Sequence, residues 1–201
     1  MEDLYPFQSF AKMARFNREV VCNEKIDGTN SQILIPDISG ELGKDNEGND
    51  IPFLVGSRTR WITPGDDNYG FASWCYANKD ELLKLGPGRH FGEFWGQGIQ
   101  RNYGLKEKRF SLFNVHRWGE ERDLKKYPNP PPSCCLVVPT IWRGLMEELN
   151  VGGLIEILKL HGSYAAEGFM QPEGIVIYHM ASGTAYKKTI ENDATPKSLQ
   201  P

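Results

Sequence analysis

The stretch Glu24-Lys25-Ile26-Asp27-Gly28-Thr29-Asn30 follows an apolar run that is typical of a short buried strand. Because side chains alternate along a strand, Lys25 and Asp27 would point to one face and Ile26 to the other. Gly28 permits a turn and a close approach of the backbone to a ligand. Taken alone, the stretch fits an ordinary ion pair at a strand end better than it fits a reactive lysine.

Length and composition indicate one globular domain without a membrane segment. The chain has 201 residues, of which 39% are hydrophobic and 24% are charged. No apolar run is long enough to span a bilayer, and the N-terminus lacks the hydrophobic core of a signal peptide. The four cysteines have no metal-binding spacing, so we expect them to be reduced and the protein to be cytosolic.

Hydrophobic patterning predicts an α+β domain with antiparallel sheets and a few flanking helices. We expect strands at 20–24, 31–35, 53–55, 90–100, 109–115, 135–138, 174–178 and 184–189. Helices are expected at 9–15, 71–85 and 151–160, with loops at 36–52 and 127–133. No linker divides the chain, so residues 1–190 form a single domain in this interpretation and residues 191–201 form a polar tail.

Several catalytic classes lack their motifs. The chain has no dinucleotide-binding glycine pattern, no P-loop, no paired histidines at helical spacing and no serine-hydrolase elbow. The net charge of −3 argues against a generally basic nucleic-acid coat. Basic residues at 12–18 and at 101–109 are interpreted as solvated surface. What remains is a set of polar residues at strand ends, namely Lys25, Asp27, Arg58, Glu93, Glu173, Lys187 and Lys188.

These residues, in this order, resemble the motifs of the covalent nucleotidyltransferases, which include DNA ligases, RNA ligases and mRNA capping enzymes. The matching stretches are Lys25–Gly28, Ser57–Arg58, Phe91–Glu93, Phe110–Val115, Glu173–Val176 and Tyr186–Thr189. One such motif is a weak signal, whereas the ordered set between residues 20 and 190 is a strong one. The resemblance implies the ATP-grasp-like nucleotidyltransferase fold of these ligases, with two antiparallel sheets and flanking helices.

Within this superfamily the chain most resembles ATP-dependent RNA ligases of the phage type-2 and RNA-editing group. Two departures concern the later motifs. Relatives usually carry Lys-x-Lys in the last motif, whereas Lys187 and Lys188 are adjacent, so alternation lets only one face the phosphates, and we favour Lys187. Asn114 stands where relatives often have Asp, which weakens a metal role there.

The resemblance implies three transfers that use ATP and Mg²⁺ or Mn²⁺. Lys25 would attack the α-phosphate of ATP to form lysyl-AMP, the AMP would pass to an RNA 5′-phosphate, and a 3′-hydroxyl would then displace it. The first step needs a neutral amine, which burial or a neighbouring cation favours.

The resemblance also implies roles for single residues. Lys25, Asp27 and Lys187 would be catalytic, and Glu173 would hold the metal. Asn30 and Arg58 would contact nucleic acid. ATP would be bound by Glu24, Lys25, Arg58, Glu93, Phe113, Glu173, Lys187 and Lys188. Phe113 would stack on adenine and Glu93 would bind the ribose, although from the residues alone Phe110 and Phe113 are equally plausible core side chains.

The predicted substrates are RNA ends or a nicked RNA duplex, as in RNA repair. Relatives usually carry a further C-terminal domain, an OB-fold or a helical module, and none is expected after Thr189. A monomer is expected, and a partner protein that supplies RNA contacts stays open, as does a viral or phage origin. The alternatives are a DNA ligase, a GTP-using capping-type enzyme and a non-catalytic module that binds RNA ends.

Overall fold

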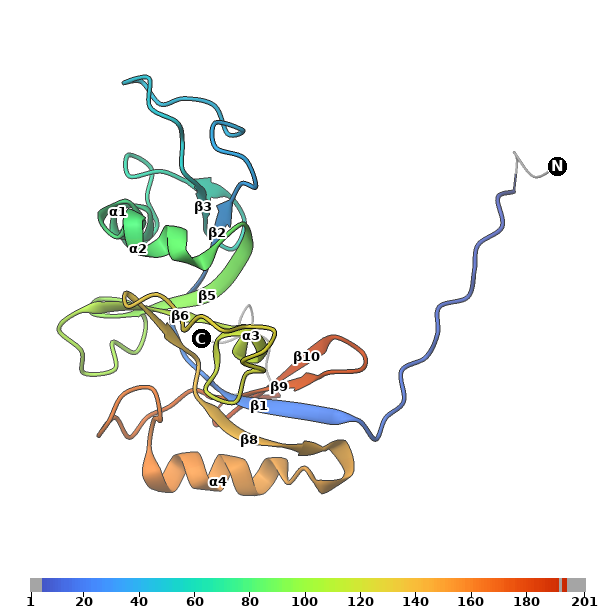
Figure 1. Cartoon of the computed structure of the whole chain (residues 1–201). Helices are drawn as coiled ribbons and strands as arrows, with labels where there is room; N and C mark the ends of the chain where they lie inside the picture. The colour runs from blue at the N-terminus through green and yellow to red at the C-terminus, as the bar shows by residue number, and fades with distance from the viewer. Residues whose placement is uncertain (1–4, 192, 195–201) are drawn as a thin grey trace.

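Two β-sheets hold the strands of this chain, with helices along their outer faces (Figure 1). The computed structural model describes residues 5–191, 193 and 194. One sheet has four strands in the order β10-β9-β1-β8, and the other has six in the order β4-β3-β2-β5-β6-β7. This arrangement confirms the predicted α+β class with two largely antiparallel sheets.

The four-stranded sheet carries the first and last strands of the fold. Its members are β1 (Glu19–Lys25), β8 (Thr140–Leu145), β9 (Gly174–His179) and β10 (Thr184–Thr189). Helix α4 (Val151–His161) follows the 3₁₀ helix η2 (Met146–Glu148) and lies along this sheet (Figure 1). Alternate residues of β1 and β9 pack against α4, including Val20, Cys22 and Ile175. The residues between them on β1 therefore lie on the face opposite the helix.

Helices bury one face of the six-stranded sheet. Its strands are β2 (Thr29–Ile35), β3 (Leu54–Gly56), β4 (Trp61–Ile62), β5 (Gly88–Gly96), β6 (Lys108–Leu112) and β7 (Cys135–Val137). Helices α1 (Phe71–Ala77) and α2 (Lys79–Leu82) and the 3₁₀ helix η1 (Leu83–Leu85) supply the apolar cover. Ile33, Phe94 and Phe110 face this core, so the residues between them on each strand face the other way.

The chain passes between the two sheets at two places. Residues 26–28 lead from β1 to β2, and residues 138–139 lead from β7 to β8. A small apolar cluster forms where these crossings meet, and it consists of Ile26, Trp95, Tyr103, Val138 and Ala166. Strands β1 and β2 are therefore not a hairpin, as a turn at Gly28 could suggest, because each pairs with different partners.

Most predicted elements are confirmed, and several differ. Residues 9–15 are extended rather than helical, and their large apolar side chains are exposed (Figure 1). Strand β8 and the short helix α3 (Val115–Trp118) were not expected. The predicted helix over 71–85 breaks at Asn78. Strand β7 pairs with β6 in parallel, so the sheet is not wholly antiparallel.

The four cysteines are free, as expected. No helix in the described part of the chain combines the length and the apolar character needed to cross a membrane. The predicted tail over 191–201 lies mostly outside the described residues.

Candidate active site

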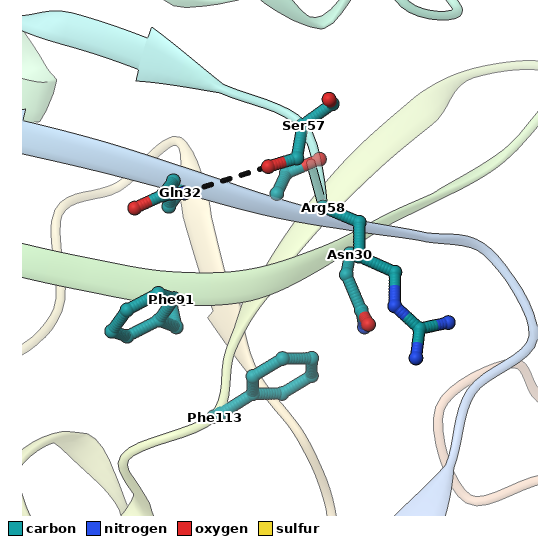
Figure 2. Close-up of a pocket in the computed structure, with 7 residues that line it drawn as sticks. Asn30, Gln32, Ser57, Arg58, Phe91 and Phe113 are labelled. Atoms are coloured by element: carbon teal, nitrogen blue, oxygen red, sulfur yellow. Dashed lines mark hydrogen bonds between the residues drawn. The ribbon is translucent and has the colours of Figure 1, made fainter. Parts of the chain in front are cut away.

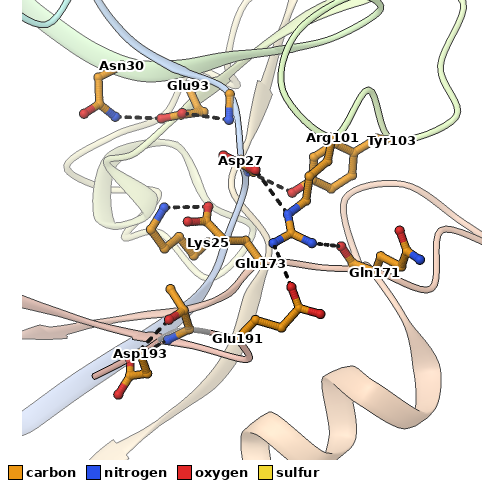
Figure 3. A network of polar contacts seen from close by, with 12 residues as sticks. Lys25, Asp27, Asn30, Glu93, Arg101, Tyr103, Gln171, Glu173, Glu191 and Asp193 are labelled. Atoms are coloured by element: carbon orange, nitrogen blue, oxygen red, sulfur yellow. Dashed lines mark hydrogen bonds and ion pairs between the residues drawn. The ribbon is translucent and has the colours of Figure 1, made fainter. Parts of the chain in front are cut away.

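Lys25 and Glu173 meet where two neighbouring strands bring their ends together. Lys25 is the last residue of β1, and it is paired with Gly174, the first residue of β9. Its Nζ donates to Glu173 Oε2 at 2.6 Å, and the two side chains are 22% and 5% exposed (Figure 3). The buried glutamate therefore has the charged partner that its burial requires.

Asp27 lies in a separate ion pair, with Arg101 (Figure 3). Arg101 Nε is 3.1 Å from Asp27 Oδ2, and its Nη1 donates to the carbonyl oxygen of Gln171 at 3.1 Å. The backbone N–H of Asp27 donates to the hydroxyl of Tyr103 at 2.8 Å. The interpretation of Arg101 as mere solvated surface was therefore wrong, because the fold brings it into contact with Asp27, 74 residues earlier in the sequence.

The loop that carries Arg101 and Tyr103 is strained. Gln100, Asn102 and Tyr103 have φ values of 45°, 60° and 52°, a region that residues other than glycine rarely adopt. Tyr103 is nevertheless buried, with its ring edge-on to Trp95 at 4.9 Å between centroids. Burial raises the pKa of the Tyr103 hydroxyl, which therefore stays neutral and accepts from Asp27. Packing thus offsets the strain and fixes the turn after Lys25.

Glu93 lies on β5 beside the same turn, opposite Asn30 near the start of β2. One carboxylate oxygen accepts from the backbone N–H of Gly28 at 3.0 Å, and the other accepts from Asn30 Nδ2 at 2.7 Å (Figure 3). Burial raises the pKa of Glu93 to about 7, although the Asn30 hydrogen bond and the charge of Lys25 act in the opposite direction. Glu93 is thus close to its titration point at neutral pH.

A pocket opens on the face of the six-stranded sheet that the helices leave uncovered. It holds about 200 Å³ and is lined by Asn30, Ser31, Gln32, Ser57, Arg58, Phe91 and Phe113. Figure 2 shows the rings of Phe91 and Phe113 along one side and the guanidinium of Arg58 extending past Asn30. Phe110, by contrast, is buried in the helix-side core. This geometry favours Phe113 over Phe110 as a ring that a ligand can reach.

The strand register separates the two adjacent lysines of β10. Residues that pair across an antiparallel ladder share a face, and Lys187 pairs with Val176, which pairs with Asn23. Lys187 therefore shares the face of Asn23 and Lys25, as alternation along β1 requires. Lys188 lies on the opposite face and forms an ion pair with Asp193 at 2.7 Å. The preference for Lys187 over Lys188 agrees with this placement.

Glu24 is directed away from that face. Its buried carboxylate accepts from the Ser163 hydroxyl at 2.6 Å and from the backbone N–H groups of Tyr164 and Ala165 at 2.8 and 2.9 Å. Burial raises its pKa, and these three donors counteract the rise. The carboxylate anchors the loop after α4 to β1, so the predicted contact of Glu24 with the nucleotide has no support from its side chain. Asn114 is likewise structural, since its side chain caps α3.

A divalent metal would have a limited set of ligands here. Among the described residues, no group of three or more histidine, cysteine or acidic side chains could enclose a metal ion. Glu173 is a buried carboxylate beside Lys25, and Mg²⁺ commonly binds through one or two carboxylates together with substrate phosphates and water. Glu173 therefore fits a metal shared with a phosphate ligand, and it does not fit an all-protein metal cage.

Comparison with known protein families adds an independent observation. A sequence profile described as RNA ligase matches residues 18–190. The chain belongs to the RNA ligase family. A comparison with characterised proteins by sequence found no match.

The RNA ligase fold is also seen in solved structures. Naegleria gruberi RNA ligase in a lysine-to-alanine form with ATP and Mn is 18% identical, with a TM-score of 0.55 over 85% of this chain. A glutamate-to-alanine form with ATP and Mn gives 16% identity and a TM-score of 0.57 over 88%, and the enzyme with PPi gives 18% and 0.54 over 85%. These matches cover 49%, 51% and 49% of the Naegleria chains, so this chain spans about half of their length.

In this RNA ligase family member, most of the predicted site residues lie around the turn after β1 or in the adjoining pocket. The structure places Lys25, Asp27, Glu93 and Glu173 around the turn in separate contacts. Asn30 bonds Glu93 and also lines the pocket with Arg58 and Phe113. Sequence reasoning missed Arg101, Tyr103 and Gln32. The density of glycine and aromatic residues after Glu93 was the signal that could have indicated the importance of the loop at 97–105.

Proposed function

We propose that this chain is an ATP-dependent RNA ligase that works through a lysyl-AMP intermediate on Lys25. The observation that carries the proposal is the Nζ of Lys25, held at 2.6 Å from the buried carboxylate of Glu173. The turn after Lys25 leads into β2, whose residue Asn30 lines a pocket that offers aromatic rings and an arginine. A lysine placed in this way has the partner that a nucleophilic amine requires. Family membership supports the same chemistry.

In the proposed complex, ATP occupies the pocket on the six-stranded sheet. Its adenine stacks on Phe113, which is 40% exposed and accessible from the pocket. The ribose hydroxyls donate to Glu93. Arg58 and Lys187 contact the phosphates, since a guanidinium binds two phosphate oxygens at once and an ammonium supplies a point charge. Neither cation has an ion-pair partner among the described residues.

The first transfer joins Lys25 Nζ to the α-phosphorus of ATP. The N–P bond forms while the bond from that phosphorus to the bridging oxygen breaks, and pyrophosphate leaves with the electron pair. The ammonium loses one proton before the attack and a second after the N–P bond has formed. Glu173 lies within hydrogen-bond distance to accept one, and solvent takes the other. Asp27, fixed by Arg101 and Tyr103, holds the turn that positions the amine for in-line attack.

A divalent cation, Mg²⁺ or Mn²⁺, is the proposed cofactor, with Glu173 as its protein ligand. It would supply positive charge for the phosphate oxygens. Arg58 and Lys187 reinforce that charge from the protein. Glu173 can serve the metal and the lysine in turn, because both are cations that satisfy a buried carboxylate.

The later transfers use RNA ends. An RNA 5′-phosphate oxygen attacks the phosphorus of lysyl-AMP and releases Lys25, and a 3′-hydroxyl then attacks the 5′-phosphate and releases AMP. Asn30 and Arg58, at the rim of the pocket, are the proposed RNA contacts. We propose RNA repair by a cytosolic monomer as the setting, and a partner protein can add RNA contacts.

Labelling with radioactive nucleotide tests this function. Incubation with α-labelled ATP and Mg²⁺ or Mn²⁺ should transfer label to the protein through an acid-labile, base-stable bond, and α-labelled GTP should not replace ATP. The labelled protein should then seal nicked RNA duplexes faster than nicked DNA. Labelling by GTP alone would indicate a capping-type enzyme, and faster sealing of DNA would indicate a DNA ligase. RNA-end binding without any label would indicate a non-catalytic module.

A further inference from the structure

The uncovered face of the six-stranded sheet continues beyond the pocket as one row of side chains. In the strand register, Trp61 pairs with Gly56, Gly56 with Gln32, and Gln32 with Phe91. Residues paired across antiparallel strands share a face, so this row runs across β4, β3, β2 and β5. Trp61 itself does not line the pocket. With about 4.8 Å between strands, the backbone of Trp61 lies about 14 Å across the sheet from that of Phe91.

Gly56 keeps this row flat. A Cβ at that position would lie 2.8 Å from Gln32 Cγ and 3.1 Å from Trp61 Cε3, so the two side chains close over the glycine from either side. The φ of Gly56 is not positive, and the glycine is required here for space rather than for backbone freedom. The result is a continuous surface in place of a ridge.

The far end of the row is aromatic and positively charged. Trp61 is 43% exposed, and the Arg89 guanidinium lies 5.3 Å from the centre of its ring. Arg89 also donates to the side-chain oxygen of Gln32, which holds the guanidinium over the sheet. Among the described residues, neither Arg89 nor Arg58 forms an ion pair with an acidic side chain.

We propose that Trp61 and Arg89 form a subsite for an unpaired base of an RNA strand, next to the nucleotide pocket. The base stacks on the exposed surface of the indole, and Arg89 contacts the adjoining phosphate. This subsite rests on the proposed ligase function, because it extends the pocket in which that function places ATP. Phe91 and Phe113 line the pocket in which adenine is placed, and Trp61 lies farther across the sheet. The base on Trp61 is therefore not the adenine of ATP.

Single-stranded RNA fits this surface better than a duplex does. An exposed ring on an open sheet face can stack with a base only if that base is free of its neighbours, as in single strands and ends. Bases inside a duplex are already stacked on each other, and duplex RNA is mostly recognised through its backbone and shape. A flat row with an aromatic ring at each end and arginines beside it has the chemistry of a stacking platform.

Direct binding to RNA tests the subsite without requiring catalysis. The affinity of the protein for a labelled, 5′-phosphorylated single-stranded oligoadenylate is measured by fluorescence anisotropy, without ATP or metal. Trp61→Ala should weaken binding about tenfold, the scale of one base stacked on an aromatic ring. Trp61→Phe should restore most of the affinity, and Arg89→Ala should weaken binding and reduce its dependence on salt concentration.

Tyr76→Ala is the matched control. Tyr76 is 42% exposed, nearly as much as Trp61, but it belongs to α1 on the covered side of the same sheet. It should bind the oligoadenylate like the wild type. Thermal unfolding of each variant verifies that the fold is intact.

Three results would overturn the subsite. The first is equal affinity of Trp61→Ala and Tyr76→Ala for the oligoadenylate. The second is a loss of affinity in Trp61→Ala that is as large for duplex RNA as for single-stranded RNA. The third is a loss of ATP affinity in Trp61→Ala, which would assign Trp61 to the ATP site. The proposed ligase function fails separately. If wild-type protein took no AMP from ATP while Trp61→Ala still lost RNA affinity, the ligase proposal would be wrong and the RNA subsite would stand.

Discussion

Glu93 is an acidic residue whose protonation depends on the fold. It is buried at the turn after β1, and its pKa is raised from the ordinary 4.5 to about 7. An acid with a raised pKa in the folded state keeps its proton longer than in the unfolded chain. Ionising it between these two values therefore favours unfolding.

The free energy of unfolding should fall as pH rises from about 4.5 to about 7, with a contribution of roughly 3 kcal/mol from Glu93. Glu93→Gln keeps an oxygen acceptor and cannot ionise, so it should lack this contribution. Urea unfolding of both proteins across this pH range provides the measurement. Glu24 also has a raised pKa, but both proteins retain it, so the difference curve isolates Glu93. Parallel curves would contradict the assignment.

Substitution of Arg101 tests whether its contact with Asp27 affects lysyl-AMP formation at Lys25. Arg101→Ala removes the 3.1 Å contact with Asp27 and should slow lysyl-AMP formation about tenfold, the equivalent of one charged hydrogen bond. Arg109→Ala is the control, since Arg109 is 31% exposed against 28% for Arg101 and pairs with Glu107 instead. Single-turnover labelling measures both variants. Equal rates would show that the Arg101 contact does not position the site.

Single residues were predictable where a motif names them, and their partners were not. The order of motifs indicated Lys25, Glu93 and Glu173, but it could not indicate that Lys25 pairs with Glu173 while Asp27 pairs with Arg101. Both contacts join segments more than 70 residues apart. Alternation did predict that Lys187 and Lys188 lie on opposite faces, because the face of a side chain depends only on its position along the strand.

At the scale of elements, the connection between β1 and β2 is the critical one. Gly28 lies in this crossing, and a Cβ there would lie 2.4 Å from the carbonyl oxygen of Phe94 and 2.8 Å from Trp95 Cβ. Its N–H also donates to Glu93. The crossing can therefore pass this closely to β5 only with glycine.

Gly28→Ala should lower the free energy of unfolding by about 1–3 kcal/mol, as overpacking against backbone does. It should also reduce lysyl-AMP formation, because the turn after Lys25 would shift. Gly65→Ala serves as the control, since the nearest atom to its Cβ is 4.0 Å away. Urea unfolding compares the two. A Gly28→Ala protein as stable as Gly65→Ala would mean that the crossing is not tightly packed.

Elements with strong apolar patterns were predictable, and short or half-exposed ones were not. Helix α4 and strands β9 and β10 lie where the pattern indicated. Strand β8 was missed because its residues are exposed or half-buried and contain no clear alternation. The helix expected at 9–15 is absent, because no apolar surface of the described chain covers its exposed side chains.

At the scale of the molecule, the candidate site depends on how the two sheets meet. Lys25 and Glu173 come from the four-stranded sheet, whereas Glu93 and the pocket belong to the six-stranded sheet. The cluster of Ile26, Trp95, Tyr103, Val138 and Ala166 joins them. Sequence patterns predicted two sheets, but strand pairing is set by contacts between distant segments, which one sequence does not reveal.

In the proposed reaction, Lys25 becomes covalently linked to AMP. The protein is incubated with ATP and Mg²⁺ or Mn²⁺, digested, and its peptides are mapped by mass spectrometry, beside Lys25→Ala and Lys187→Ala. We expect the AMP adduct on the peptide that contains Lys25, none in Lys25→Ala, and a reduced amount at the same lysine in Lys187→Ala. An adduct on another residue, or an unmodified wild-type protein with an intact fold, would contradict the assignment of Lys25 as the nucleophile.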